Sequence, residues 1–133
     1  MERHGDCYTY FAIIGDFDPQ RVSEILGLEP ERTQKKGEIL HGGRQSKISR
    51  WEIGWCRECE PHTATQMEKT IAPLLKKTDE LNKVRKDLGA ELYLCVVPTL
   101  LRDGVNPSLS PSLAVIDFCH ETRTMIDIDL YVE

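Results

Sequence analysis

The sequence predicts an α+β fold, a two-layer sandwich in which a mainly antiparallel sheet has its helices packed against one face. Two observations lead to this prediction. Strand-like segments alternate with amphipathic segments, two of which open on a proline, and the order is β-α-β, a long helix, then β-α-β, in the broad ferredoxin-like style. The 133 residues suit one hydrophobic core, so we expect a single domain over residues 1–133.

The composition is that of a soluble globular protein, with 40% hydrophobic and 29% charged residues. The sequence shows neither a signal peptide nor an apolar run long enough to span a bilayer, so we expect a cytoplasmic protein without a membrane partner. The five cysteines are an odd number and suggest reduced thiols. A net charge of −5 makes general nucleic-acid binding unfavourable, because that binding depends on neutralising phosphates.

The first β-α-β unit opens with an apolar strand from Cys7 to Gly15, which we expect to be covered on both faces or nearly so. A short helix follows. Asp18 is its predicted N-cap, Pro19 lies in its first turn, and Gly27 ends it.

The returning strand of this unit runs from Ile48 to Trp55, where apolar and polar residues alternate. Trp51 and Ile53 are expected to point inward. The alternation gives this strand one largely apolar and aromatic face, formed by Ser49, Trp51, Ile53 and Trp55.

A long amphipathic helix is predicted next and ends at Gly89. Thr63 and Gln66 have the spacing of a capping box at its start. Pro73 interrupts the pattern, because an interior proline loses a backbone hydrogen bond and clashes with the preceding turn. We therefore expect the helix to kink or to begin again at that proline.

The second β-α-β unit begins with an apolar strand from Ala90 to Val97, and Pro98 is predicted to open a loop. The dipeptide Ser110-Pro111 has the pattern of a helix start. The final segment, Thr124 to Val132, alternates strictly and predicts one half-buried strand.

The densest cluster of charge lies in a loop between Arg32 and Arg50, where six basic residues accompany one acid. Such segregation indicates either an anionic partner or a loop held by internal salt bridges. The pair Ile39-Leu40, between glycine turn signals, predicts a ragged hairpin or an edge strand. The candidate binding residues are Arg32, Lys36 and Arg44.

Two further hypotheses for a site involve Cys56 and Cys59. The first is a redox pair, since Trp55-Cys56-Arg57-Glu58-Cys59 resembles the motif of thioredoxins, although the predicted helix start at Thr63 leaves Cys56 outside the first turn. The second is a zinc site with His62 as a third ligand, although a fourth ligand is not evident. An unliganded loop is the plainer interpretation, and we expect neither a metal nor another cofactor.

Other catalytic signatures are weak. Asp127 and Asp129 share a strand face as paired carboxylates might, but a solvated face, or partners for the basic loop, is the favoured interpretation. Neither a phosphate-binding glycine loop nor a nucleophile elbow is present. The sequence leaves open whether the protein is an enzyme, and the weak catalytic signatures favour a protein that is not one.

Several stretches, in this order along nearly the whole chain, resemble the bacterial domain of unknown function 4279 family. That family has no agreed activity, so the resemblance implies no catalytic residues. Its pattern has no cysteine pair after the tryptophan strand, which makes Cys56 and Cys59 peculiar to this chain. The matching stretches are Tyr10-Phe11-Ala12 to Gly15, Gly27-Leu28-Glu29-Pro30 with Arg32, Lys36-Gly37, Arg44, Ser49 with Trp51-Glu52-Ile53, Asn106 to Pro111, and Asp127 to Tyr131.

We expect a non-enzymatic binding module, either immunity-like or of another protein-interaction kind, that uses the basic loop to recognise an unknown protein. The alternative is an enzyme or binder that acts on an anionic small molecule or a nucleotide, with the same cations holding phosphate. A thiol redox protein is a third and less favoured hypothesis.

Overall fold

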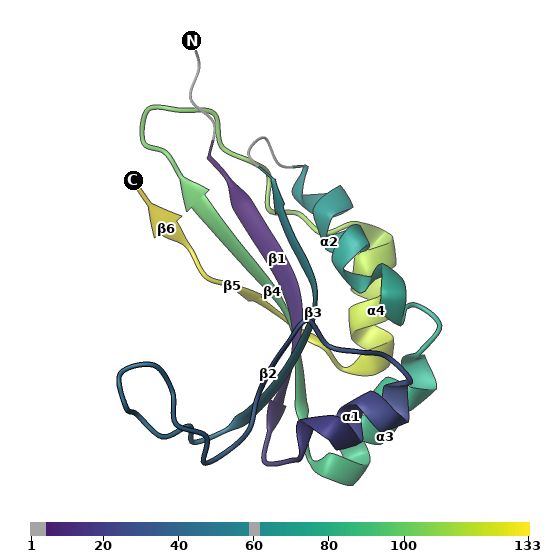
Figure 1. The fold of residues 1–133 in the computed structure, drawn as a ribbon. Helices are drawn as coiled ribbons and strands as arrows, with labels where there is room; N and C mark the ends of the chain where they lie inside the picture. The colour runs from purple at the N-terminus through teal and green to yellow at the C-terminus, as the bar shows by residue number, and fades with distance from the viewer. Residues whose placement is uncertain (1–4, 59–61) are drawn as a thin grey trace.

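A computed structural model describes residues 5–58 and 62–133. It confirms the two-layer α+β sandwich, with a six-stranded sheet on one side and the helices on the other (Figure 1). The strands are β1 (Cys7–Gly15), β2 (Arg32–Gln34), β3 (Ser49–Glu58), β4 (Glu91–Leu100), β5 (Met125–Ile128) and β6 (Tyr131–Val132). The helices are α1 (Pro19–Leu26), α2 (Thr63–Ile71), α3 (Thr78–Leu88) and α4 (Leu113–Thr122), with a 3-10 turn η1 at Ala72–Leu74.

The strand order is β2-β3-β1-β4-β5, and β6 pairs with β4 beyond the end of β5. β1 is the central strand and runs antiparallel to both β3 and β4, whereas β5 and β6 run parallel to β4. The two β-α-β units therefore differ. The connection through α1 joins antiparallel neighbours, and the connection through α4 joins parallel ones.

The hydrophobic core lies between the sheet and the helices, while the opposite face of the sheet is open (Figure 1). Trp51 and Phe11 are its largest fully buried side chains. Along β1 the residues at odd positions enter this core, whereas Tyr8 and Tyr10 point to the open face. The sheet is thus covered on one face only, which corrects the expectation that β1 is covered on both.

The first helix forms as its local sequence predicts. The Asp18 carboxylate accepts a hydrogen bond from the Gln20 backbone N–H at 3.1 Å. Gly27 ends the helix with φ of 65°, a left-handed conformation that glycine adopts without steric cost. The bounds of β1 are also those predicted.

The predicted long helix begins again at Pro73, as one of the two expected outcomes, and divides into α2, η1 and α3. The predicted capping box at its start is wrong. Thr63 donates its hydroxyl to the Ser108 carbonyl oxygen, and the Gln66 side chain turns toward the sheet. The N-cap residue is His62, which makes no side-chain capping bond. A loop carbonyl group thus takes the Thr63 hydroxyl, and carbonyl groups of the sheet take the Gln66 amide, in place of the helix terminus.

The expectation that Pro98 opens a loop is also wrong, because β4 continues to Leu100. The Thr99 N–H donates to the Asp6 carbonyl oxygen on the β1 side at 2.9 Å. Since successive residues of a strand direct their N–H groups to opposite sides, Pro98 lacks an N–H only on the side of β5 and β6. There it faces the gap between those two short strands, where the missing donor leaves no ladder bond broken.

The last helix and strand differ in detail from prediction. Ser112, and not Ser110, caps α4, with its hydroxyl oxygen accepting from the Val115 N–H at 3.3 Å. The terminal strand is broken into β5 and β6, and among its apolar residues only Ile126 packs against the core. None of the helices in the described parts of the chain is long and apolar enough to cross a membrane.

Candidate functional site

A β-bulge in β3 organises the open face of the sheet. Thr9 pairs with Cys56 and Phe11 pairs with Ile53, so Gly54 and Trp55 together oppose the single residue Tyr10. The bulge adds one residue to the alternation of β3. Trp55 consequently points to the open face, and the expectation that it shares a face with Trp51 is wrong.

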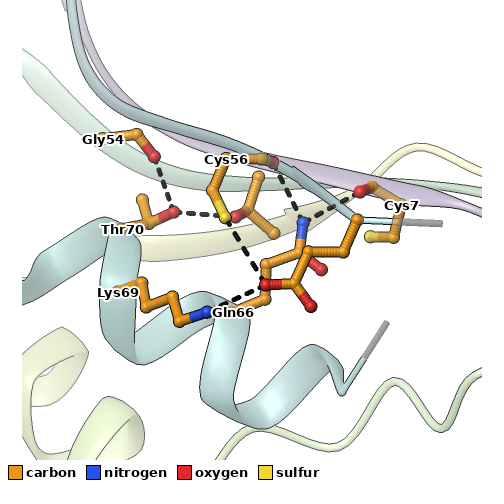
Figure 2. A network of polar contacts seen from close by, with 8 residues as sticks. Cys7, Gly54, Cys56, Gln66, Lys69 and Thr70 are labelled. Carbon is orange, nitrogen blue, oxygen red and sulfur yellow. Dashed lines mark hydrogen bonds and ion pairs between the residues drawn. The ribbon is translucent and has the colours of Figure 1, made fainter. Parts of the chain in front are cut away.

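Helix α2 holds the bulge from the covered side, as Figure 2 shows. The Thr70 hydroxyl donates to the Gly54 carbonyl oxygen at 2.7 Å and shares a second hydrogen bond of 2.7 Å with the Thr9 hydroxyl. Gly54 has φ of +78°, and a Cβ atom on it would lie 2.3 Å from the Thr70 carbonyl oxygen. Glycine is therefore required here for both its conformation and its size.

The buried Gln66 side chain ties α2 to both neighbouring strands. Its amide Nε2 donates to the carbonyl oxygens of Cys7 at 2.9 Å and Cys56 at 3.0 Å (Figure 2). Lys69 and Glu58 form an ion pair at 2.9 Å at the surface end of the same network. The bulge is thus fixed by α2, the helix that follows β3 in the chain.

Three aromatic rings are stacked on the open face. The Trp55 ring lies 4.2 Å from the Tyr10 ring and 5.5 Å from the Tyr8 ring, measured between centroids, with interplanar angles of 4° and 19°. The Arg32 guanidinium carbon lies 4.2 Å from the Trp55 ring centroid, within the range of a cation–π interaction. We call Tyr8, Tyr10, Trp55 and Arg32 the aromatic cluster.

Acidic side chains fix Trp55 in place. The Glu31 carboxylate accepts from the backbone N–H groups of Gly54 at 2.9 Å and Trp55 at 3.2 Å. Glu52 accepts from the indole N–H at 3.1 Å and from Arg50 Nε at 2.8 Å. The indole is therefore held through both its backbone and its ring.

The protonation of this face is set by burial and close neighbours. Burial and the adjacent Cys95 raise the pKa of Tyr10, so its phenol is neutral at physiological pH. Burial lowers the pKa of Arg50, but the hydrogen bond and charge of Glu52 outweigh this effect and leave its pKa raised. The Arg50–Glu52 ion pair is thus charged and internally satisfied.

The candidate basic residues lie in three different environments. Arg32 belongs to the aromatic cluster, and Lys36 pairs with Asp16 at an exposed site, at 2.8 Å. Arg44 lies in the loop between β2 and β3, which extends to the side of the sheet opposite the helices (Figure 1). Within residues 5–58 and 62–133 no ion pair involves Arg44. Among the basic residues of this segment, the ion pairs of the described parts of the chain therefore involve Lys36 and Arg50 only.

The loop itself is an irregular hairpin. Ile39 and Gln45 form an isolated antiparallel bridge, and Leu40 N–H donates to the Arg44 carbonyl oxygen at 2.7 Å. Its base is closed by Gln34, whose amide donates to the Ser46 hydroxyl at 2.6 Å. The ragged hairpin predicted around Ile39-Leu40 is present, whereas the edge strand β2 lies earlier, at Arg32–Gln34.

The redox and zinc hypotheses find little support in the geometry. Cys56 lies within β3, well before the start of α2, and burial and Glu58 raise the pKa of its thiol. A redox nucleophile needs the opposite shift. Cys59 lies outside the described residues, and His62 is exposed. Among the described residues, no three His, Cys, Asp or Glu side chains are grouped to hold a metal ion.

Sequence reasoning missed the aromatic cluster. Tyr8 and Tyr10 occupy alternate positions of β1, a pattern that indicates a shared face. The glycine before Trp55 is the corresponding signal in β3, since glycine within a strand often marks a bulge. Together these two signals could have placed all three rings on the open face.

Comparison with known proteins gives one match. Residues 5–133 match the family model described as "Domain of unknown function (DUF4279)". No match was found among the curated proteins or among the solved structures. The family match covers nearly the entire chain, in agreement with the resemblance carried by its motifs, and the protein therefore belongs to the DUF4279 family.

Proposed function

We propose that this protein is a non-enzymatic binding module, immunity-like or of another protein-interaction kind, that recognises its partner with the open face of the sheet. The observation that carries the proposal is the aromatic cluster. Tyr8, Tyr10 and Trp55 stack on a sheet face that none of the described helices covers, with Arg32 over the indole ring. Tyr, Trp and Arg are the residues most enriched in binding hot spots.

The rigidity of the cluster supports binding. Glu31 holds the Trp55 backbone N–H and Glu52 holds its indole N–H, so little side-chain entropy remains to be lost when a partner binds. The bulge that orients the indole is itself fixed by Thr70 from α2. A preformed surface of this kind suits recognition.

The charge near this face favours an acidic partner. Lys35, Arg44 and Lys47 are exposed on the loop, and no ion pair among the described residues involves them. The loop extends to the same side of the sheet as the aromatic cluster (Figure 1). Unpaired cations at the rim of an interface steer and orient an acidic surface.

The alternative, an anionic small molecule or nucleotide, has weaker support. A pocket of about 310 Å³ beside the loop is lined by Thr33 and Lys35, but Asp18 and Glu29 also line it. Those carboxylates repel an anion.

We place the module in the cytoplasm, since the described cysteines, Cys7, Cys56, Cys95 and Cys119, are free.

The test is affinity capture from cells of the source organism with the wild-type protein and three variants. Arg32→Ala removes the cation over Trp55, and Arg44→Ala removes a loop cation without an internal ion pair. Lys83→Ala is the matched control, because Lys83 is an exposed cation on α3, away from the open face. We expect a partner retained by the control and lost with both other variants. Equal recovery with all three variants would exclude the open face as the interface.

A further inference from the structure

The outer edge of β5 is a second surface that lacks a partner. Among the described residues β5 pairs with β4 alone. The Asp129 N–H donates to the Val96 carbonyl oxygen on β4 at 2.9 Å, so the backbone groups of Ile126 and Ile128, at the alternate positions, point outward. These N–H and C=O groups can pair with a further strand.

The two edges of the sheet are protected very differently. The β2 edge spans three residues and continues directly into Lys35 and Lys36 and the folded loop. Both edges are short, since β5 spans four residues, but lysine is a further device that prevents an edge from pairing, and the β2 edge continues into two lysines. The β5–β6 edge has neither lysine nor proline, and its exposed apolar residues include Met125, Ile128, Leu130, Tyr131 and Val132.

The charge of this edge restricts what can pair with it. Asp127 is paired with Cys95, which is paired with Tyr10, so its side chain lies on the open face. Asp127 and Asp129 are both exposed. A second copy of β5 would bring like charges together, whereas a strand with basic residues would place opposite charges across the pair.

We propose that the β5 edge accepts an extended segment of a partner protein, with alternating apolar and basic residues, as an additional strand of the sheet. Backbone hydrogen bonds to Ile126 and Ile128 give the affinity, and Asp127 and Asp129 select the basic side chains. The backbone edge of β5 takes no part in the aromatic cluster or the basic loop, although Asp127 lies on the same open face as the cluster. The proposal for the β5 edge is therefore independent of the proposed function.

The test uses two synthetic peptides with acetylated and amidated ends, one alternating Val and Lys and the other alternating Val and Glu. Binding is measured by calorimetry, and protection of single amides by hydrogen exchange in NMR. We expect the Val-Lys peptide to bind and to slow exchange at Ile126 and Ile128 at least tenfold. The Val-Glu peptide should leave both amides unchanged.

Charge reversal tests whether Asp127 and Asp129 select basic side chains. The double variant Asp127→Lys, Asp129→Lys should have at least tenfold lower affinity for the Val-Lys peptide and should bind the Val-Glu peptide. Asp103→Lys with Asp117→Lys is the control with the same change in net charge at exposed positions outside β5. Circular dichroism verifies that both variants fold.

Three outcomes overturn the proposal. The first is no protection of Ile126 and Ile128 at 1 mM peptide. In the second, both charge-reversal variants weaken binding equally, which shows only attraction to the net charge. In the third, the protein alone dimerises with protection of Ile126 and Ile128, which makes a second copy the occupant.

Discussion

Trp51 and Trp55 belong to the same strand, yet they lie on opposite faces of the sheet. Trp51 is fully buried in the core, and its indole N–H donates to the Ser23 hydroxyl on α1 at 2.9 Å. Trp55 is half-buried on the open face, where its indole N–H donates to Glu52 at 3.1 Å. Without the bulge at Gly54 both rings would enter the core. One inserted glycine thus lets a single strand contribute to stability on one face and to recognition on the other.

The largest expected effect comes from removing the buried ring. Trp51→Ala should lower the free energy of unfolding by about 3–5 kcal/mol, because it leaves a large cavity and an unpartnered Ser23 hydroxyl. Urea denaturation followed by circular dichroism measures the loss. A decrease below about 1 kcal/mol would contradict the assignment of Trp51 to the core.

The bulge itself should be the next most sensitive feature. Gly54→Ala combines an unfavourable positive φ with a contact of 2.3 Å to the Thr70 backbone oxygen, and we expect a loss of about 3 kcal/mol. Gly42→Ala is the matched control. Gly42 has φ of +88°, but its Cβ would have no neighbour within 4 Å, so only the cost of conformation, about 1 kcal/mol, remains. Equal losses in the two variants would mean that α2 does not restrict the bulge.

Trp55→Ala should be milder for stability than Trp51→Ala and more damaging to binding. The aromatic stack and the cation–π contact together contribute about 1–2 kcal/mol. Denaturation and capture of the partner are measured in parallel. A variant that loses more than about 3 kcal/mol would place Trp55 among the core residues, against its position on the open face.

The thiols should show the smallest difference between the two faces. Cys95 lies on the open face beside Tyr10 and Cys7 on the covered face, and burial raises the pKa of each to about 11. A Cys59→Ser background restricts labelling to the described thiols. In it we expect Cys7 and Cys95 to react slowly and at similar rates with a thiol reagent at pH 8, as followed by mass spectrometry. Rapid labelling of Cys95 alone would show that the open face admits water to the sheet.

The same shift predicts a dependence of stability on pH. In the unfolded chain the Cys95 thiol ionises near its ordinary value of 9.0, whereas in the folded protein it holds its proton up to about pH 11. The contribution of the protonated Cys95 thiol to the free energy of unfolding is therefore complete below pH 9 and is lost as the pH rises toward 11. Denaturation of the wild type and of Cys95→Ala at pH 8 and pH 10.5 measures this contribution. Between pH 8 and pH 10.5 the variant should lose less stability than the wild type.

Features fixed by local chemistry were predictable from the sequence. Asp18, Pro19 and Gly27 define α1 through contacts within a few residues. The orientation of Trp55 was not predictable in this way, because the bulge depends on Thr70, which contacts Gly54 from the following helix and not from within a few residues. Gln66 likewise serves the sheet and not its own helix terminus.

The candidate site shows the same division. Charge counting along the chain identified the basic loop and Arg32, but it could not show that Arg32 lies over an indole ring. That contact requires both the pairing of β2 with β3 and the bulge. Residues that act together across strands are determined by register, which the local sequence specifies only weakly.

The position of β1 at the centre of the sheet also has a kinetic consequence. β1 pairs with β4, so residues near Tyr8 must meet residues near Val97, with most of the chain closed into a loop between them. Topologies with such distant contacts fold slowly, on a scale of about milliseconds to seconds. Until β4 docks, β1 has an unpaired edge beside the Tyr8 and Tyr10 rings. During synthesis the antiparallel pair of β1 and β3, formed before β4 docks, is therefore the species that we expect to be most exposed to misassociation.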